Sequence, residues 1–162
     1  MLSVEQLKVW LKNCEKLAIL GIGNSMRGDD AIGIEIVEML TGKTPRNVRV
    51  FNCQIVPENF IEKIKQFNPT HVLMIDAADF KAEPGEVKLI SPEEISGLTI
   101  STHSIPLNVL AEIIQETMHA KVLILGIQPE TTEFGSKITE KIQKAAERLT
   151  DELLKLLKEH FK

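Results

Sequence analysis

Three short apolar runs constrain the fold more than any other feature of this sequence. They are KLAILGIG at 16–23, HVLMID at 71–76 and KVLILGI at 121–127. Each run is continuous and rich in Ile, Leu and Val, which is typical of a strand that is covered on both faces. Segments with helical patterns separate the runs, so we expect a mostly parallel sheet with helices on both sides.

Two alternating segments and several helices complete the predicted fold. NVRVFNC at 47–53 and EVKLI at 86–90 alternate as strands do, and the second follows the turn EPGE, which predicts an edge strand. Helices are expected at 4–13, 30–40, 58–67, 106–118 and 137–161. The prediction is a three-layer α/β sandwich with a doubly wound sheet of about five strands.

Composition narrows the classes of protein that the chain can belong to. Its 162 residues, 43% of them hydrophobic and 26% charged, fit one globular domain over 1–162. The net charge of −4 and the lack of a basic cluster argue against a nucleic acid partner. There is neither a signal peptide nor an apolar run of about 20 residues, so we expect a cytoplasmic protein without membrane insertion.

The two cysteines point to no disulfide or structural zinc site. Cys14 and Cys53 lack the CxxC spacing that such a zinc site needs. They are interpreted as two reduced thiols.

The stretch GIGNSMRGDD at 21–30 first suggests a phosphate-binding loop. Met26 stands where a dinucleotide fingerprint needs its third glycine, and the lysine of a phosphate loop is missing. Asp29 and Asp30 would also repel a phosphate at the start of the following helix. One of the two acids is expected to cap that helix, which leaves the other as a candidate for chemistry.

Further candidates lie where other predicted strands end. Asp76 closes the strand at 71–76, and Asp79 is expected to be a solvated loop residue. His103 precedes the helix that Pro106 opens, where Ser104 is a plausible cap, and a helix N-terminus favours the neutral imidazole that binds metals. His71 lies at the opposite edge of the sheet, about 16 Å from Asp76.

Two other readings of the polar residues are weaker. Ser101 and Ser104 flank His103, but no G-x-S-x-G elbow supports a serine nucleophile. His119 and His160 are expected at the surface.

The candidate site therefore combines carboxylates with one imidazole. Asp29 or Asp30, Asp76 and His103 come from three loops that this fold brings to one edge of the sheet. One nitrogen and several oxygen ligands suit a divalent ion such as zinc, nickel or cobalt. Three protein ligands would leave coordination positions open for a substrate.

The sequence resembles the hydrogenase maturation proteases, most closely the hydrogenase 3 type. The resemblance rests on five blocks in order: GIGNSMRGDDAIG at 21–33, PEN at 57–59, IDAADFKAEPGEVKLISPEEI at 75–95, STHSIPLNVL at 101–110 and LGIQPE at 125–130. It runs from about residue 17 to about residue 150. Residues 1–16 are then expected to be a helical N-terminal extension.

The resemblance implies a nickel-dependent endopeptidase, classed with aspartic-type peptidases. It would remove the C-terminal extension of a [NiFe] hydrogenase large-subunit precursor. Nickel would be carried by the substrate, and no organic cofactor is implied. By motif, the metal-binding and catalytic positions fall on Asp30, Asp76 and His103, and this assignment settles the choice between the two adjacent acids.

The same motifs suggest residues that support the site or bind substrate. These are Gly23, Asn24, Asp29, Pro57 and Glu58.

The chain departs from the family pattern at one place, and two alternative functions are also considered for it. Relatives usually carry Asp-Gly-Gly after the second strand, where this chain has Asn52, Cys53 and Gln54, so its substrate contacts there are expected to differ.

A non-catalytic nickel-binding chaperone for hydrogenase assembly would use the same three ligands. A nucleotide-binding α/β domain would explain the glycine turn but not the paired acids.

Overall fold

Five of the strands form one continuous sheet in the computed structural model, which describes residues 4–97, 99–100 and 105–162. The strands are β1 (Leu17–Ile22), β2 (Val48–Gln54), β3 (His71–Asp79), β4 (Val87–Ile90), β5 (Thr99–Ile100) and β6 (Lys121–Ile127). The sheet order is β2-β1-β3-β6-β4, and β5 pairs with β3 beside this path. Pairing is parallel except at β4 and β5.

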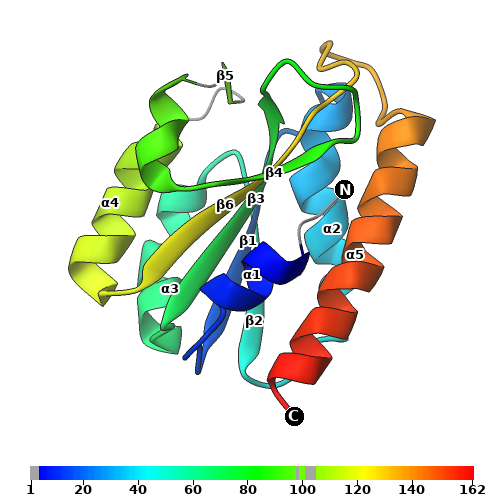
Figure 1. Ribbon diagram of the computed structural model, residues 1–162. Coiled ribbons are helices and arrows are strands. Elements are labelled where there is room, and N and C mark those ends of the chain that lie inside the picture. The colour runs from blue at the N-terminus through cyan, green and yellow to red at the C-terminus, as the bar shows by residue number, and fades with distance from the viewer. Residues whose placement is uncertain (1–3, 98, 101–104) are drawn as a thin grey trace.

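Helices cover both faces of the sheet (Figure 1). They are α1 (Val4–Trp10), α2 (Ile32–Leu40), α3 (Ile61–Phe67), α4 (Leu107–Met118) and α5 (Glu140–His160). Three short 3₁₀ helices, Gly28–Ala31, Pro57–Phe60 and Pro92–Gly97, accompany them. The predicted class, an α/β sandwich with a mostly parallel sheet, is confirmed.

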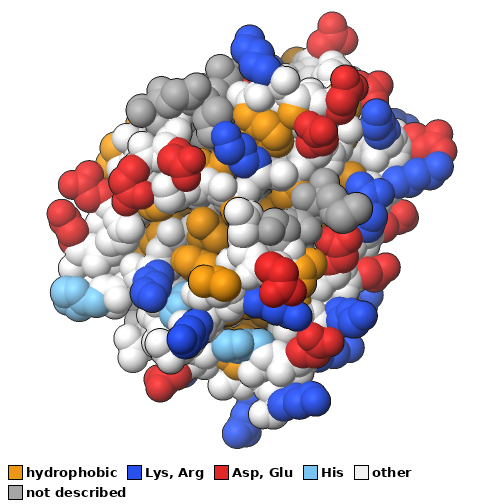
Figure 2. Space-filling view, viewed as in Figure 1, with side chains coloured by type: hydrophobic (Ala, Val, Ile, Leu, Met, Phe, Trp, Pro, Cys, Tyr) orange, Lys and Arg blue, Asp and Glu red, His pale blue; other side chains and the backbone are white. Residues whose placement is uncertain are grey.

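Two apolar clusters lie on opposite faces of the sheet. One packs α1, α2 and α5 against side chains such as Ile19 and Leu73, and the other packs α3 and α4 against Leu20 and Met74. This alternation is what strands buried on both faces require. On the molecular face drawn in Figure 2, acidic and basic side chains are interspersed.

Two glycines allow α2 to lie unusually close to the strands. A Cβ atom on Gly33 would stand 2.3 Å from the carbonyl oxygen of Ile75 and 2.5 Å from that of Ile22. A Cβ on Gly21 would stand 2.4 Å from Val37. The glycines therefore serve helix–sheet packing at the end of β1, and this contact fixes where the preceding loop lies.

The structure corrects several predicted boundaries. β3 does not end at Asp76 but continues to Asp79, because Ala78 and Asp79 pair with β5, a strand that the sequence did not reveal. The helices α2 and α3 begin later than predicted, since each is preceded by a 3₁₀ helix. Likewise α5 begins at Glu140, three residues later than predicted, and α1 ends at Trp10, three residues earlier than predicted.

Other predicted elements are confirmed closely. β6 has the predicted bounds, and β4 is the antiparallel edge strand. Pro106 is the residue before α4 and not its first helical residue. Among the described helices, none is long and apolar enough to cross a membrane.

Because α2 lies so close to the strands, one glycine-to-alanine substitution in this helix is expected to destabilise the protein. Alanine normally stabilises a helix relative to glycine by up to about 1 kcal/mol. Gly33→Ala should instead lower the free energy of unfolding by about 1–3 kcal/mol, because its methyl group would overlap two backbone oxygens. Urea denaturation measures this. Glu38→Ala, at an exposed position of the same helix, is the control and should stay within about 0.5 kcal/mol of the wild type.

Candidate functional site

The candidate site lies at the carboxyl ends of β1 and β3. From β1 the chain crosses to β2 on one side, and β3 lies on the other side, so strand order reverses between β1 and β3. Open α/β sheets bind ligands at such a reversal. The 3₁₀ helix Gly28–Ala31 packs against β3 there, which brings the loop after β1 to the strand that carries Asp76.

Asp30 is held inside this 3₁₀ helix with a buried side chain that is 2% exposed. Its Oδ2 atom accepts a hydrogen bond from the backbone N–H of Asn24 at 3.1 Å. The side-chain oxygen of Asn24 accepts one from the N–H of Met26, which closes a turn. Asn24 thus shapes the loop and orients Asp30 through its backbone.

Asp76 is fully buried within β3, where it pairs with Gly126 of β6. Because side chains alternate along a strand, Asp76 faces the same side as Met74 and Ala78, the side that α4 covers. Its Oδ1 atom accepts a hydrogen bond from the N–H of Ala77 at 2.8 Å. A buried carboxylate is costly unless hydrogen bonds or a cation stabilise it, and this cost marks the position as a candidate site.

Asp29 does not cap a helix, contrary to the prediction for one of the two acids. The residues before the 3₁₀ helix and before α2 are Arg27 and Ala31, so neither acid is an N-cap. The Asp29 carboxylate instead accepts hydrogen bonds from the N–H groups of Glu130, Thr131 and Thr139, at 2.9, 3.1 and 2.7 Å. The Thr139 hydroxyl adds a further contact at 3.0 Å.

The loop after β6 is therefore fastened to the loop after β1. Backbone N–H groups of Gly28, Asp29 and Gly135 add hydrogen bonds to the carbonyls of Ser136, Thr131 and Met26. Gly28 has a φ of 54° and stands so close to Thr131 that a Cβ would lie 2.8 Å from its carbonyl oxygen. Asp29 supports the position of Asp30 by fixing the backbone next to it.

Gln128 is an organising residue that the sequence analysis missed. Its buried side-chain oxygen accepts hydrogen bonds from the N–H groups of Phe80 and Ala82, and its amide donates to Asp79. Hydrogen bonds from the Lys81 backbone and from Gln128 lower the pKa of Asp79. Asp79 is thus half-buried and bonded, not merely solvated. The LGIQPE block, which contains Gln128, was the available signal.

His103 and the serines Ser101 and Ser104 lie outside the described residues. Among the residues that the structure describes, no group of three or more His, Cys, Asp or Glu side chains is arranged to hold a metal. Asp30 and Asp76 are described and buried, and a metal-binding role for them and for His103 stays a prediction.

The end of β2, where Asn52, Cys53 and Gln54 stand, has an irregular backbone. Gly21 pairs with Asn52 and Ile22 with Gln54, so Cys53 is the extra residue of a β-bulge. Gln54 has a φ of 52°, and its carbonyl accepts a hydrogen bond from Gly23. The bulge joins the ends of β1 and β2 beside the candidate site.

Pro57 and Glu58 follow this bulge in a 3₁₀ helix. Pro57 is buried and Glu58 is half-buried. Burial and, to a smaller extent, the charge of Glu58 raise the pKa of the Cys53 thiol to about 12. A thiol that stays protonated at neutral pH is a poor nucleophile, so Cys53 is not suited to covalent catalysis.

The remaining histidines lie away from the carboxylates. His71 is buried at the start of β3, edge-on to Trp10, and burial lowers its pKa. His119 and His160 are exposed, as predicted. His160 contacts the carbonyl of Cys14, which precedes β1, so it lies at the opposite edge of the sheet.

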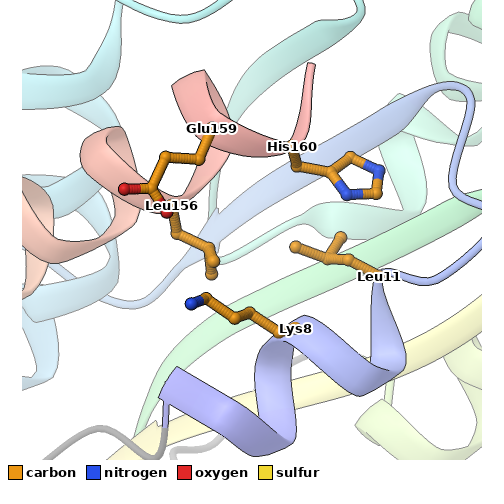
Figure 3. Close-up of a pocket in the computed structure, with 5 residues that line it drawn as sticks. All are labelled: Lys8, Leu11, Leu156, Glu159 and His160. Carbon is orange, nitrogen blue, oxygen red and sulfur yellow. The ribbon is translucent and has the colours of Figure 1, made fainter. Parts of the chain in front are cut away.

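A cavity at that opposite edge is not a good candidate for the active site. It has a volume of about 280 Å³, lies between α1 and the end of α5, and is lined by Lys8, Leu11, Leu156, Glu159 and His160 (Figure 3). It contains none of the buried carboxylates. The buried side chains of Asp30 and Asp76 lie instead at the carboxyl edge of the sheet.

Comparison with known proteins identifies the class of this molecule. Residues 34–156 match the family described as hydrogenase maturation protease. That range contains Asp76 and His103 and begins after Asp30.

Individual relatives match over most of their length. A putative hydrogenase maturation protease of Methanocaldococcus jannaschii is 37% identical over 96% of each chain. The hydrogenase 3 maturation protease of Escherichia coli is 35% identical over 83% of this chain and 86% of its own. The crystal structure of the [NiFe] hydrogenase maturation protease HycI from Thermococcus kodakarensis has a TM-score of 0.87 and 34% identity, over 94% and 99% of the chains.

The chain belongs to the hydrogenase maturation protease family and is accordingly an enzyme, an endopeptidase. The resemblance seen in the sequence is confirmed.

The contacts of Asp29 predict a structural rather than a chemical defect on its removal. Asp29→Ala should lower the free energy of unfolding by about 3 kcal/mol, because three N–H groups of Glu130, Thr131 and Thr139 lose a charged acceptor. Urea denaturation provides the measurement. Glu133→Ala, exposed in the same loop, should change it by less than about 0.5 kcal/mol. Equal stability of both variants would show that the carboxylate is not what holds the loop.

The two thiols should be unreactive in the folded protein. Cys14 and Cys53 are free and buried, and burial raises the pKa of both. At pH 8, roughly one Cys53 thiol in ten thousand would be ionised. Mass spectrometry after iodoacetamide treatment should detect no modification of the native protein and two alkylated thiols in urea. Rapid labelling of native Cys53 would contradict its burial.

Proposed function

We propose that this endopeptidase removes the C-terminal extension of a [NiFe] hydrogenase large-subunit precursor after nickel has been inserted. The observation that carries the proposal is the pair of buried carboxylates, Asp30 and Asp76, on neighbouring elements at the reversal of strand order. Membership of the family supplies the reaction class. The hydrogenase 3 maturation protease of Escherichia coli is similar over most of its length, which favours a hydrogenase precursor as substrate.

The carboxylates would recognise the nickel that the substrate carries. In this proposal the precursor presents its ion to the cleft, and the oxygens of Asp30 and Asp76 ligate it. Carboxylates buried to 2% and 0% exposure are held without bulk water, so a cation that reaches them gains strongly from the interaction. This binding energy would orient the scissile peptide bond, and a precursor without nickel would not be positioned.

His103 is proposed as the third ligand. The described end of β5 supports the assignment, because Ile100 pairs with Ala78, two residues beyond Asp76 on β3. His103 follows Ile100 by three residues in the sequence. An imidazole nitrogen beside two carboxylate oxygens suits a borderline ion such as nickel.

Two mechanisms of peptide hydrolysis are compatible with these residues. The substrate's ion can polarise the scissile carbonyl or a nearby water. Alternatively, a carboxylate can act as general base towards water while the ion only docks the substrate. In both cases Asp29, Asn24 and Gln128 hold the loops and touch no reacting atom.

Substitution of the acids tests the proposed site. Asp30→Asn and Asp76→Asn keep the side-chain shape but remove the charge, and each should reduce processing at least about a hundredfold. His103→Ala should have a similar effect. Gel analysis of the shortened large subunit gives the rate. Asp79→Asn, three residues further along β3, is the matched control and should stay within a few-fold of the wild type. A fully active Asp76→Asn variant would remove that residue from the site.

Comparison of two precursor preparations tests nickel recognition. The wild-type enzyme should shorten the nickel-loaded precursor and leave the nickel-free precursor intact over the same period. Equal cleavage of both precursors would overturn the proposed recognition of nickel, although the protease assignment would stand. Tight binding of the loaded precursor without cleavage would instead indicate an assembly chaperone.

A further inference from the structure

Exposed apolar side chains gather at the same edge of the sheet as the buried carboxylates. Among the described residues, the exposed large hydrophobic side chains are those of Val9, Met26, Ile55, Val109 and Phe134. Three of these five lie in loops that follow β1, β2 and β6, at the carboxyl edge of the sheet. Isolated exposed apolar side chains are ordinary, so a contact between such side chains is needed before they indicate an interaction surface.

Two of the exposed side chains belong to loops that are bonded together. Phe134 is 67% exposed and Met26 is 57% exposed. The N–H of Gly135 donates to the carbonyl of Met26 at 2.7 Å, and the guanidinium of Arg27 lies 5.8 Å from the centre of the Phe134 ring. We call Met26, Arg27 and Phe134 the rim cluster.

The backbone beneath the rim cluster is held in place. The Asp29 carboxylate and the hydrogen bonds from Gly28 and Asp29 to Ser136 and Thr131 fasten both loops. Arg27 also donates to the carbonyl of Thr132 at 3.4 Å. Side chains presented by a fixed backbone lose less conformational entropy when a partner covers them. The network that stabilises these loops therefore also holds the backbone of Met26, Arg27 and Phe134 in place.

We propose that the rim cluster is a docking surface for the folded body of the hydrogenase large-subunit precursor, which rests on the function proposed above. Aromatic residues, methionine and arginine are enriched in protein interfaces and dominate their binding energy. Arg27 is three residues from Asp30, so a protein whose scissile bond lies at Asp30 comes close to this loop. Contacts at the rim then hold the precursor while its chain enters the cleft.

A second copy of this chain fits the rim cluster less well. A stable interface buries about 800 Å² on each partner, far more than three side chains offer. A precursor gains the remaining area from the adjoining cleft. A symmetric dimer through this surface would also cover the loop that carries Asp30.

Kinetics with the purified large-subunit precursor test the proposal. Phe134→Ser and Met26→Ser should each raise KM about tenfold while kcat stays within about twofold, because docking and not chemistry is lost. Phe134→Leu should retain most of the affinity. Val9→Ser is the matched control, since Val9 is 73% exposed but lies on α1, before the amino end of β1. The thermal unfolding of all four variants should match the wild type.

The outcomes separate docking from the proposed function. A KM of Phe134→Ser within twofold of the wild type, or a fall in kcat alone, would overturn the docking surface while leaving the protease reaction intact. A wild-type enzyme that does not cleave the precursor would overturn the function.

Binding is measured separately by biolayer interferometry of the wild-type and Phe134→Ser enzymes with the nickel-free precursor, which is expected to stay uncleaved. Weaker binding by Phe134→Ser than by the wild type supports the docking surface, whereas equal binding overturns it. A wild-type dimer in light scattering that Phe134→Ser dissociates would also overturn it, in favour of self-association.

Discussion

The carboxylate of Asp29 is the interaction on which the arrangement of the site depends. It gathers three N–H groups from residues 130–139, more than one hundred positions away in the sequence. Because hydrogen bonds to a charged acceptor are stronger than neutral ones, one side chain can fix the relative position of two long loops. Asp30 follows directly in the chain, so the hydrogen bonds of its neighbour help to set its position.

The glycines near the end of β1 also contribute to this arrangement, through the packing of α2 against the sheet. Gly33 brings the first turn of α2 against the backbones of β1 and β3, and Gly23 adopts a φ of 155° as the chain leaves the strand. A helix set further from the sheet would carry its preceding loop, and thus Asp30, away from Asp76. The glycine-rich turn therefore serves packing and carboxylate placement, and its resemblance to a phosphate loop is superficial.

Sequence reasoning predicted the regular parts of the fold well, because apolar runs and helical periodicity are local signals. It placed β6 and β4 correctly and named Asp76, but it stopped β3 three residues early, since pairing with the short β5 leaves no pattern in the sequence. It assigned helix capping to one of the acids because that is their usual role at such a position. The distant partners of Asp29 could not be inferred from spacing, and neither could the contacts of Gln128.

The bulge at Cys53 also affects the outer edge of the sheet. Among the strands that the structure describes, β2 and β4 form the edges, and neither pairs with a further strand on its outer side. In β2 the bulge twists the last residues out of register, and in β4 the strand has only four residues and is followed closely by Pro92. Irregular or short edges accept a further strand poorly. The same backbone irregularity that shapes the second loop thus helps to keep the sheets of separate molecules from joining at high concentration.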